Sequence, residues 1–226
     1  MNKIKKVLVV AAHPDDELLG CGGTLIKLAK KNCKIFTLFF TDGVSARGNK
    51  FSKKVNNRKN NALKSLKIMG VHSSKFLSYP DNGLDTVPLI KIVREIEQII
   101  TKFKPDTILT HSNADLNIDH EIVSRAVVTA SRPKPNFCVK NILLFETLSS
   151  TEWNFNLKKK TFNPNYFIDI TLTIKKKIKA AKAYKNEINS WPHPRSIKGI
   201  KNLASYRGQS VGLKYAEAFY LLRYVS

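Results

Sequence analysis

Two short groups of histidine and acidic residues, far apart in the chain, contain side chains of the types that bind metal ions. The first group is His13-Pro14-Asp15-Asp16-Glu17 and the second is Asp119-His120. Three ligands of the imidazole and carboxylate types, with a fourth position left open, are typical of a catalytic zinc site. Asp15 lies between His13 and Asp16 and cannot easily bind the same ion, so it is free to act as a base. These residues predict metal-assisted hydrolysis.

Each group follows a stretch that predicts a buried strand. The apolar run Val7–Ala12 precedes the first group, and Thr107–His111 precedes the second. Continuous apolar runs are typical of parallel strands that are buried on both faces. Ligands of open α/β sheets bind at the carboxyl ends of the strands, where the strand order reverses. We therefore expect the two groups, together with His111, to face one another across one crevice.

The order of the other predicted elements defines the fold class. Strands and helices alternate up to Glu146, which is typical of parallel βαβ units with right-handed crossovers. We expect an α/β fold with a Rossmann-like, doubly wound, mostly parallel sheet whose core has the order 3-2-1-4-5. The further strands are predicted at Lys34–Thr41, Lys75–Tyr79 and Asn141–Glu146, and the helices at Glu17–Lys31, Phe51–Gly70, Pro88–Phe103 and Asn117–Ser131.

The C-terminal part of the sequence has a different pattern. Tyr166–Ile170 predicts an edge strand, and Ile174–Tyr184 and Ile197–Tyr206 have helical periodicity. The stretch Trp191-Pro192-His193-Pro194 separates the two helices, because proline excludes a helix there. We expect a single domain over residues 1–226, with a Rossmann-like core in residues 1–150 and a C-terminal helical cover in residues 151–226.

The composition argues against several classes of protein. Lys and Arg number 39 against 17 Asp and Glu, which gives a net charge of +22. The basic residues are mostly Lys and are spread along the sequence without interleaved aromatic residues, so we expect a solvated basic surface and no nucleic-acid partner. No apolar window approaches the length of a membrane span, and the three cysteines form no C-x-x-C pair. Without a leader peptide before the first strand we expect a cytoplasmic protein, and the sequence is compatible with a homo-oligomer.

Each candidate residue also has a purely structural explanation. An isolated Asp at the start of a helix more often caps the helix, and an isolated His at a strand end is more often a hydrogen-bonded core residue. Capping explains one Asp per helix, so the combination of both groups favours the metal site. The alternative function is a nucleotide-binding, Rossmann-like regulatory or transferase domain without metal hydrolysis. That class needs a glycine fingerprint after the first strand, which Gly20-Cys21-Gly22-Gly23 does not match.

The same residues resemble those of a known enzyme family. The string Ala12-His13-Pro14-Asp15-Asp16-Glu17, followed by Thr41-Asp42-Gly43 and Asp119-His120, is similar to the PIG-L or LmbE-like metal-dependent deacetylases. The resemblance implies hydrolysis of the N-acetyl group of an N-acetylglucosamine-type sugar or sugar conjugate, nucleotide- and lipid-linked forms included, in polysaccharide or glycoconjugate biosynthesis. It also implies that zinc, or iron in its place, is held by His13, Asp16 and His120.

The resemblance further implies roles for residues around the metal. Asp15 is the general base, and Arg58 and Asp81 match an arginine and an acid that contact the substrate. We expect Arg47, Asn82 and His111 to bind substrate as well. Arg47 and Arg58 both follow the second strand near the mouth of the crevice, and guanidinium groups there suit a phosphate-bearing sugar.

One departure from the family pattern affects the catalytic residues. Many members have His-Pro-Asp-His where this chain has Asn117-Ile118-Asp119-His120. In those members the first His helps to stabilise the oxyanion and pairs with the Asp, which is Asp119 here. The Asn117 amide can donate a hydrogen bond to an oxyanion but cannot shuttle a proton. His111 and His193 are the candidates for the missing imidazole, and we expect His193, which two prolines hold in a stiff loop, to replace it.

Overall fold

The computed structural model describes residues 4–47, 52–135, 137–155 and 161–226. In this part of the chain, seven strands form one sheet in the order β3-β2-β1-β4-β5-β7-β6. The first five strands of that order pair in parallel, which confirms the predicted core order 3-2-1-4-5. The strands are β1 (Lys6–Ala11), β2 (Lys34–Thr41), β3 (Ser73–Tyr79), β4 (Thr107–His111), β5 (Asn141–Phe145), β6 (Tyr166–Asp169) and β7 (Ala216–Tyr224).

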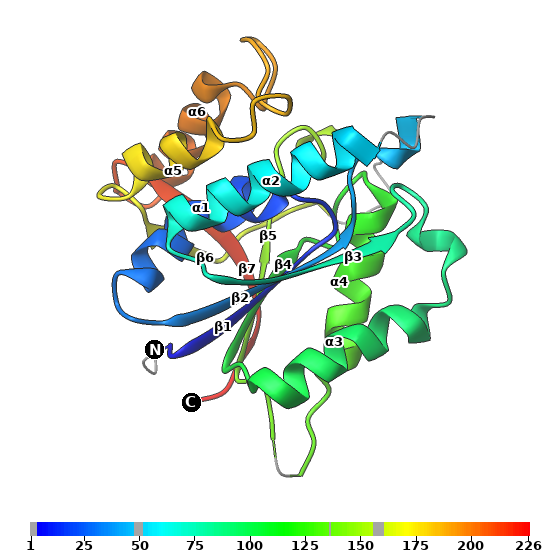
Figure 1. Cartoon of the computed structure of the whole chain (residues 1–226). Helices are drawn as coiled ribbons and strands as arrows, with labels where there is room; N and C mark the ends of the chain where they lie inside the picture. Colours follow the sequence, from blue (N-terminus) through cyan, green and yellow to red (C-terminus); the bar gives the residue numbers. More distant parts are fainter. Residues whose placement is uncertain (1–3, 48–51, 136, 156–160) are drawn as a thin grey trace.

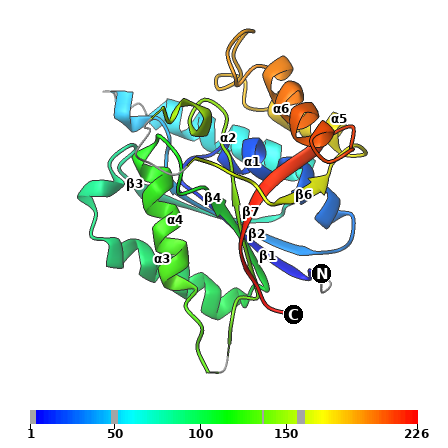
Figure 2. The ribbon, with the colours of Figure 1, turned by 180° about the vertical axis from the view of Figure 1, so that it is seen from behind.

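Helices cover both faces of the sheet (Figures 1 and 2). One layer contains α1 (Asp16–Ala29), α2 (Ser52–Met69), α5 (Ile174–Ala181) and α6 (Ile197–Gln209), and the other contains α3 (Leu89–Phe103) and α4 (Ile118–Ala130). Three short 3-10 helices, η1 (Ser45–Arg47), η2 (Leu84–Thr86) and η3 (Thr151–Trp153), lie in loops. None of the described helices combines the length and the apolar composition needed to cross a membrane.

Strand β1 explains why the sheet has a helical layer on each side. Val7 and Val9 pack into the hydrophobic core under α1 and α2, whereas Leu8 and Val10 pack into the core under α3 and α4. All four side chains are fully buried. A strand that is apolar at successive positions must be covered on both faces, because neighbouring side chains point to opposite sides of the sheet. β1 therefore lies between the two helical layers, paired with β2 on one side and β4 on the other.

The C-terminal segment contributes strands as well as helices. β6 is the predicted edge strand, but β7 was not predicted from the sequence. β7 lies between β5 and β6 and is antiparallel to both. The expected helical cover is therefore only part of this segment, which also widens the sheet by two strands. Glu217, near the start of β7, is of a type that is depleted in strands, so the local sequence did not indicate where this strand begins.

A buried ion pair compensates the charge of Glu217. Lys177 Nζ lies 2.6 Å from Glu217 Oε1, and both side chains are only 4% exposed. The Glu217 carboxylate also accepts the backbone N–H groups of Gly23 and Thr24, each at 2.7 Å. Lys177 in turn donates to the carbonyl oxygen of Leu19 at 2.8 Å. Because these backbone groups lie inside α1, the pair fixes α5 and β7 to the helix that begins at Asp16.

The basic residues are distributed unevenly between the two helical layers. α2, α5 and α6 contain no Asp or Glu. The opposite layer carries acids in both of its helices, for example Glu95 and Glu97 in α3 and Glu121 in α4. Lysines that are scattered along the sequence therefore gather on one side of the sheet, in the layer that includes α2.

Candidate metal centre

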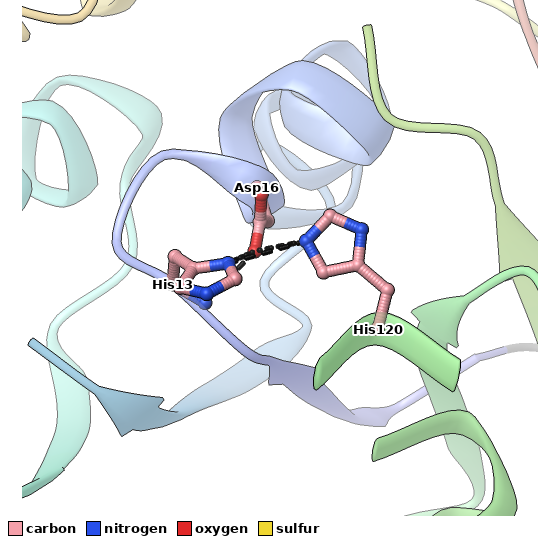
Figure 3. Close-up of side chains that lie close together, drawn as sticks. All are labelled: His13, Asp16 and His120. Atoms are coloured by element: carbon pink, nitrogen blue, oxygen red, sulfur yellow. Dashed lines mark hydrogen bonds and ion pairs between the residues drawn. The ribbon is translucent and has the colours of Figure 1, made fainter. Parts of the chain in front are cut away.

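The side chains of His13, Asp16 and His120 converge at the carboxyl ends of β1 and β4 (Figure 3). His13 Nδ1 lies 3.2 Å from Asp16 Oδ2 and 3.2 Å from His120 Nε2. His120 Nε2 lies 3.4 Å from the same Asp16 oxygen. Tetrahedral bonds of about 2.0–2.1 Å, as around zinc, would place neighbouring ligand atoms roughly 3.3 Å apart. The spacing of these three donor atoms therefore fits one metal ion.

The first turn of α1 brings Asp16 to this position. Its Oδ2 atom accepts the backbone N–H of His13 at 2.8 Å, which folds the side chain back over the end of β1. The other carboxylate oxygen, Oδ1, is buried and has no hydrogen-bond donor among the described residues. A buried carboxylate oxygen without a partner is costly, and a cation bound at this carboxylate would compensate it.

Further carboxylates orient the two imidazoles. His120 Nδ1 lies 3.1 Å from Asp115 Oδ1, and His13 Nε2 lies 3.2 Å from Asp119 Oδ2 and 3.2 Å from Asp81 Oδ1. With the ring protons on these outer nitrogens, the lone pairs of His13 Nδ1 and His120 Nε2 point to the centre of the cluster. Carboxylates that hold the remote nitrogen of a metal-binding imidazole fix its tautomer and raise its basicity.

The electrostatics of the cluster favour a bound cation. Burial alone would lower the pKa of His13, but hydrogen bonds to Asp119 and Asp16 raise it well above its ordinary value. Burial would also lower the pKa of His120, but the carboxylates of Asp16 and Asp115 outweigh burial and raise it to about 9. Burial would raise the pKa of Asp16, yet the nearby imidazoles hold it well below its usual range. Protons and divalent metals compete for such a group of bases.

Asp119 contacts the loop after β3, which carries Asn82. The Asp119 carboxylate accepts the backbone N–H of Asn82 at 2.8 Å and of Leu84 at 3.0 Å. Asn82 Oδ1 accepts a hydrogen bond of 2.8 Å from the Asn117 side chain. The loop after β3 is thereby fixed to the start of α4, and this contact brings Asp81 to His13.

His111 does not occupy the position expected of a substrate-binding residue. The ring is fully buried. Its Nε2 accepts the backbone N–H of Ala12 at 2.9 Å, and its Nδ1 lies 3.3 Å from the Thr147 hydroxyl. Burial and the neighbouring His120 lower the pKa of His111 to about 3, so the ring is neutral. It supports the cluster from beneath, where no substrate reaches it.

Asp15 lies beside the cluster and is held in an unusual backbone conformation. Its φ angle is 127°, a value that residues with a side chain rarely adopt. Its backbone N–H donates to Glu17 Oε2 at 3.0 Å, and the Tyr184 hydroxyl donates to Glu17 Oε1 at 2.7 Å. Burial raises the pKa of Glu17 to about 8. Strain of this kind is concentrated at functional sites, where surrounding contacts impose the conformation.

Arg58 is a buried structural partner of the site. Its guanidinium group donates to the carbonyl oxygens of Pro14 and Gly43 and pairs with Asp15 at 3.2 Å and with Glu187 at 2.9 Å. Gly43, with a φ of 67°, packs so closely that a Cβ atom would lie 2.7 Å from Arg58 Cζ, so the turn after β2 requires glycine. These contacts commit Arg58 to the protein, so the predicted phosphate contact does not fit its position. The side chain of Arg47 lies outside the described residues.

A cavity opens on the other side of Arg58. Its volume is about 300 Å³, and its lining combines one acid, two cations and two amides with the turn after β2. The lining residues are Gly43, Val44, Lys54, Arg58, Asn61, Asn186 and Glu187. This polar cavity adjoins the carboxylate of Asp15 through Arg58.

The two residues proposed for oxyanion stabilisation have different surroundings. The Asn117 side chain caps α4, accepting the backbone N–H groups of Asp119 and His120, and its NH₂ group donates to Asn82. His193 is half-buried in the loop before α6, and its ring packs edge-on against Trp153. His193 Nδ1 accepts the backbone N–H of Arg195 at 3.0 Å. This contact places the ring proton of neutral His193 on Nε2.

Several residues of the site were not predicted from the sequence. Asp115 accepts hydrogen bonds from Ser150 and Thr151 and lies against His120. Burial would raise the pKa of its carboxyl, but His120, together with Ser150 and Thr151, lowers it to about 2. Glu187 and Arg195 come from the C-terminal segment and reach Arg58 and Asp15. An acidic residue between β4 and His120 could have indicated Asp115 as a partner of His120. Nothing local indicated the other two.

Comparison of structures places the fold among enzymes of more than one activity. The N,N'-diacetylchitobiose deacetylase from Pyrococcus horikoshii is similar, with a TM-score of 0.79 at 22% identity over 97% of this chain and 84% of that one. GalB, the 4-carboxy-2-hydroxymuconate hydratase of Pseudomonas putida, has a TM-score of 0.73 at 20% identity over 99% and 98% of the two chains. At these identities the likeness shows the fold alone, so the chemistry depends on the site.

Sequence comparison is more specific. The chain is 27% identical to the diacetylchitobiose deacetylase of Thermococcus kodakarensis, over 96% of this chain and 82% of that protein. It is 32% identical to the uncharacterized deacetylase YaiS of Escherichia coli, over 66% of this chain and 77% of that protein. Residues 8–131, which include both groups of the cluster, match the family model described as PIG-L: GlcNAc-PI de-N-acetylase. The chain therefore belongs to the PIG-L family.

Proposed function

We propose that this protein is a metal-dependent hydrolase that removes the N-acetyl group from an N-acetylglucosamine-type sugar or sugar conjugate. The observation that carries the proposal is the convergence of His13, Asp16 and His120 beside a carboxylate, Asp15, that is not one of the three donors. Relatives named as deacetylases, one of them acting on diacetylchitobiose, support the reaction class.

The three converging residues would hold the ion. Two neutral imidazoles and one carboxylate, with an open fourth position, are the donor set of catalytic zinc sites, and Fe²⁺ is the alternative metal. When bound, such an ion lowers the pKa of water to about 7 and polarises an amide carbonyl. The outer carboxylates Asp115 and Asp119 keep the imidazole lone pairs directed inward throughout the reaction.

Asp15 is the proton carrier in this proposal. Its carboxylate takes a proton from the attacking water as the C–O bond forms at the acetyl carbonyl. It then returns that proton to the amide nitrogen as the C–N bond breaks, so that acetate and a free amine leave. General acid–base catalysis by one positioned group typically contributes on the order of 10²–10⁴-fold.

His193 remains our candidate for the oxyanion donor. Its Nδ1 is occupied by the backbone N–H of Arg195, which leaves Nε2–H as a donor. The loop that carries His193 reaches the site, because Arg195 pairs with Asp15 at 3.0 Å. A preorganised N–H aimed at the developing oxyanion stabilises it in the transition state. Asn117 is less suitable, since its NH₂ group already donates to Asn82.

The cavity beside Arg58 suits a polar substituent of the sugar. Lys54 lines it, and Lys54 belongs to α2, a helix without acidic residues. A cation in the lining of a polar cavity favours an anionic group, so we propose a phosphate-bearing, nucleotide- or lipid-linked N-acetyl sugar as substrate. Lys54 would then make the contact with the substrate phosphate that the sequence suggested for Arg58.

The deciding experiment combines metal analysis with acetate release. Purified protein should contain about one equivalent of zinc or iron, lose it to a chelator and regain activity on reloading with one of the two metals. Free N-acetylglucosamine, diacetylchitobiose, and nucleotide- and lipid-linked N-acetyl sugars would be assayed for acetate and free amine. If the protein binds no metal and releases no acetate from any of these substrates, the nucleotide-binding alternative remains. Binding of nucleotides to the metal-free protein would then test that alternative.

A further inference from the structure

Asp15 is paired with two arginines, one on each carboxylate oxygen. Arg58 Nη2 lies 3.2 Å from Oδ1, and Arg195 Nη1 lies 3.0 Å from Oδ2. The Asp15 side chain is only 3% exposed, so both contacts are shielded from solvent. The two arginines lie far apart in the sequence, in α2 and in the loop before α6.

The two contacts leave the carboxylate capable of accepting a proton. An ionised carboxylate has about four lone-pair sites on its two oxygens, and each guanidinium group contacts one oxygen. At least one site per oxygen is therefore left for water or substrate. With both oxygens contacted from outside the cluster, rotation about the Cβ–Cγ bond would break at least one charged hydrogen bond, and such bonds are the stronger ones.

Arg195 differs from Arg58 in how it is anchored. Its Nε atom donates to the Leu148 carbonyl oxygen at 3.2 Å and to Ser149 Oγ at 2.5 Å. Leu148 and Ser149 lie in the loop after β5, so Arg195 joins that loop to the loop after β1. Its side chain is 20% exposed, against 7% for Arg58. Arg195 therefore lies at the rim of the site, and its removal leaves the buried Arg58 network in place.

We propose that Arg195 is a positioning residue for Asp15: it fixes the orientation of the catalytic carboxylate and couples it to the C-terminal segment. This inference rests on the proposed function, because positioning matters only if Asp15 transfers protons. A misplacement of about 1 Å in a reacting group can cost on the order of 10²-fold in rate. A lost orientation should therefore lower kcat while substrate binding through the cavity beside Arg58 is retained.

A kinetic experiment tests the positioning role. Arg195→Ala is expected to lower kcat by about 10- to 100-fold and to change KM by less than about threefold. Added guanidinium ion should restore part of kcat in Arg195→Ala, and Arg195→Lys should retain more activity than Ala, because each returns a cation to Oδ2. Metal content should equal that of the parent. The matched control is Arg207→Ala, which removes a comparably exposed arginine that pairs with Glu146 away from Asp15.

A stability experiment on the metal-free protein gives an independent readout. If Arg195 contacts Asp15, the loss of Tm caused by Arg195→Ala should shrink by at least half in an Asp15→Asn background, since contacting residues are not additive. The loss caused by Arg207→Ala should be the same in both backgrounds. Additive Tm changes, or a parent-like kcat in Arg195→Ala, would overturn the inference. If the parent shows no deacetylation, the proposed function fails, and the stability experiment alone decides whether Arg195 holds Asp15.

Discussion

The ring of His111 stacks on the ring of His120, with centroids 3.9 Å apart and planes inclined by 14°. The same ring accepts the backbone N–H of Ala12, directly before His13. One buried, neutral side chain thus supports two of the three proposed metal ligands, one by stacking and the other through the backbone.

This relationship gives the first prediction. His111→Phe keeps a stacking ring but removes the acceptor for the Ala12 N–H, so His13 should lose its fixed position. Metal affinity should fall by about 10- to 100-fold, as for other residues that orient ligands. Competition with a chromophoric chelator measures the change. An unchanged affinity would show that stacking alone is sufficient.

The three proposed metal ligands give the second prediction. His13→Ala, Asp16→Ala and His120→Ala should each lose bound metal while the protein remains folded, because the cluster lies at the rim of the sheet and its side chains are not part of the hydrophobic cores. Elemental analysis and circular dichroism check the two parts. Full metal occupancy in two of the three variants would refute the assignment.

The third prediction concerns the base. Asp15→Asn keeps the shape of the side chain and removes its ability to take a proton, so kcat should fall by roughly three orders of magnitude with metal content unchanged. Steady-state kinetics of acetate release on the metal-loaded variant provide the measurement. Turnover within about threefold of the parent would mean that another residue is the base.

The fourth prediction concerns His193. His193→Ala should lower kcat by about 10²-fold if the ring donates to the oxyanion, with metal content retained. Trp153→Ala is a useful comparison, because it removes the ring that packs against His193 without removing the donor. A parent-like kcat for His193→Ala would return the oxyanion role to Asn117 or to backbone groups.

The fifth prediction concerns the buried pair of Lys177 and Glu217. Glu217→Gln leaves the Lys177 cation buried without its counter-charge, so the free energy of unfolding should fall by about 3 kcal/mol. Glu97→Gln is the matched control, because its partner Lys134 is 60% exposed and a surface pair contributes about 1 kcal/mol or less. Chemical denaturation of both variants measures the difference. Equal effects would mean that the hydrogen bonds to α1, not the charge, stabilise this junction.

The sequence by itself determined the parallel core and the place of the three proposed metal ligands. The run Val7–Ala12 is apolar at successive positions, which requires a strand covered on both faces, and the acids that follow it can lie only at its carboxyl end. With the strand order 3-2-1-4-5, the same reasoning brings His120 to the other side of the crevice. These features were accessible because each depends on a local pattern and on one rule of sheet topology.

Only the tertiary structure decided which residues surround those ligands. Arg195 contacts Asp15 across 180 positions. Glu217 of β7 accepts backbone N–H groups of α1, although acids are uncommon in buried strands. Only the fold shows that His111 supports the cluster from within the protein, through the backbone N–H of Ala12. Only the fold shows that lysines scattered along the sequence lie on one helical layer. Such contacts depend on how distant segments pack. A charged side chain gives no sign in its own neighbourhood of the buried partner that will compensate it.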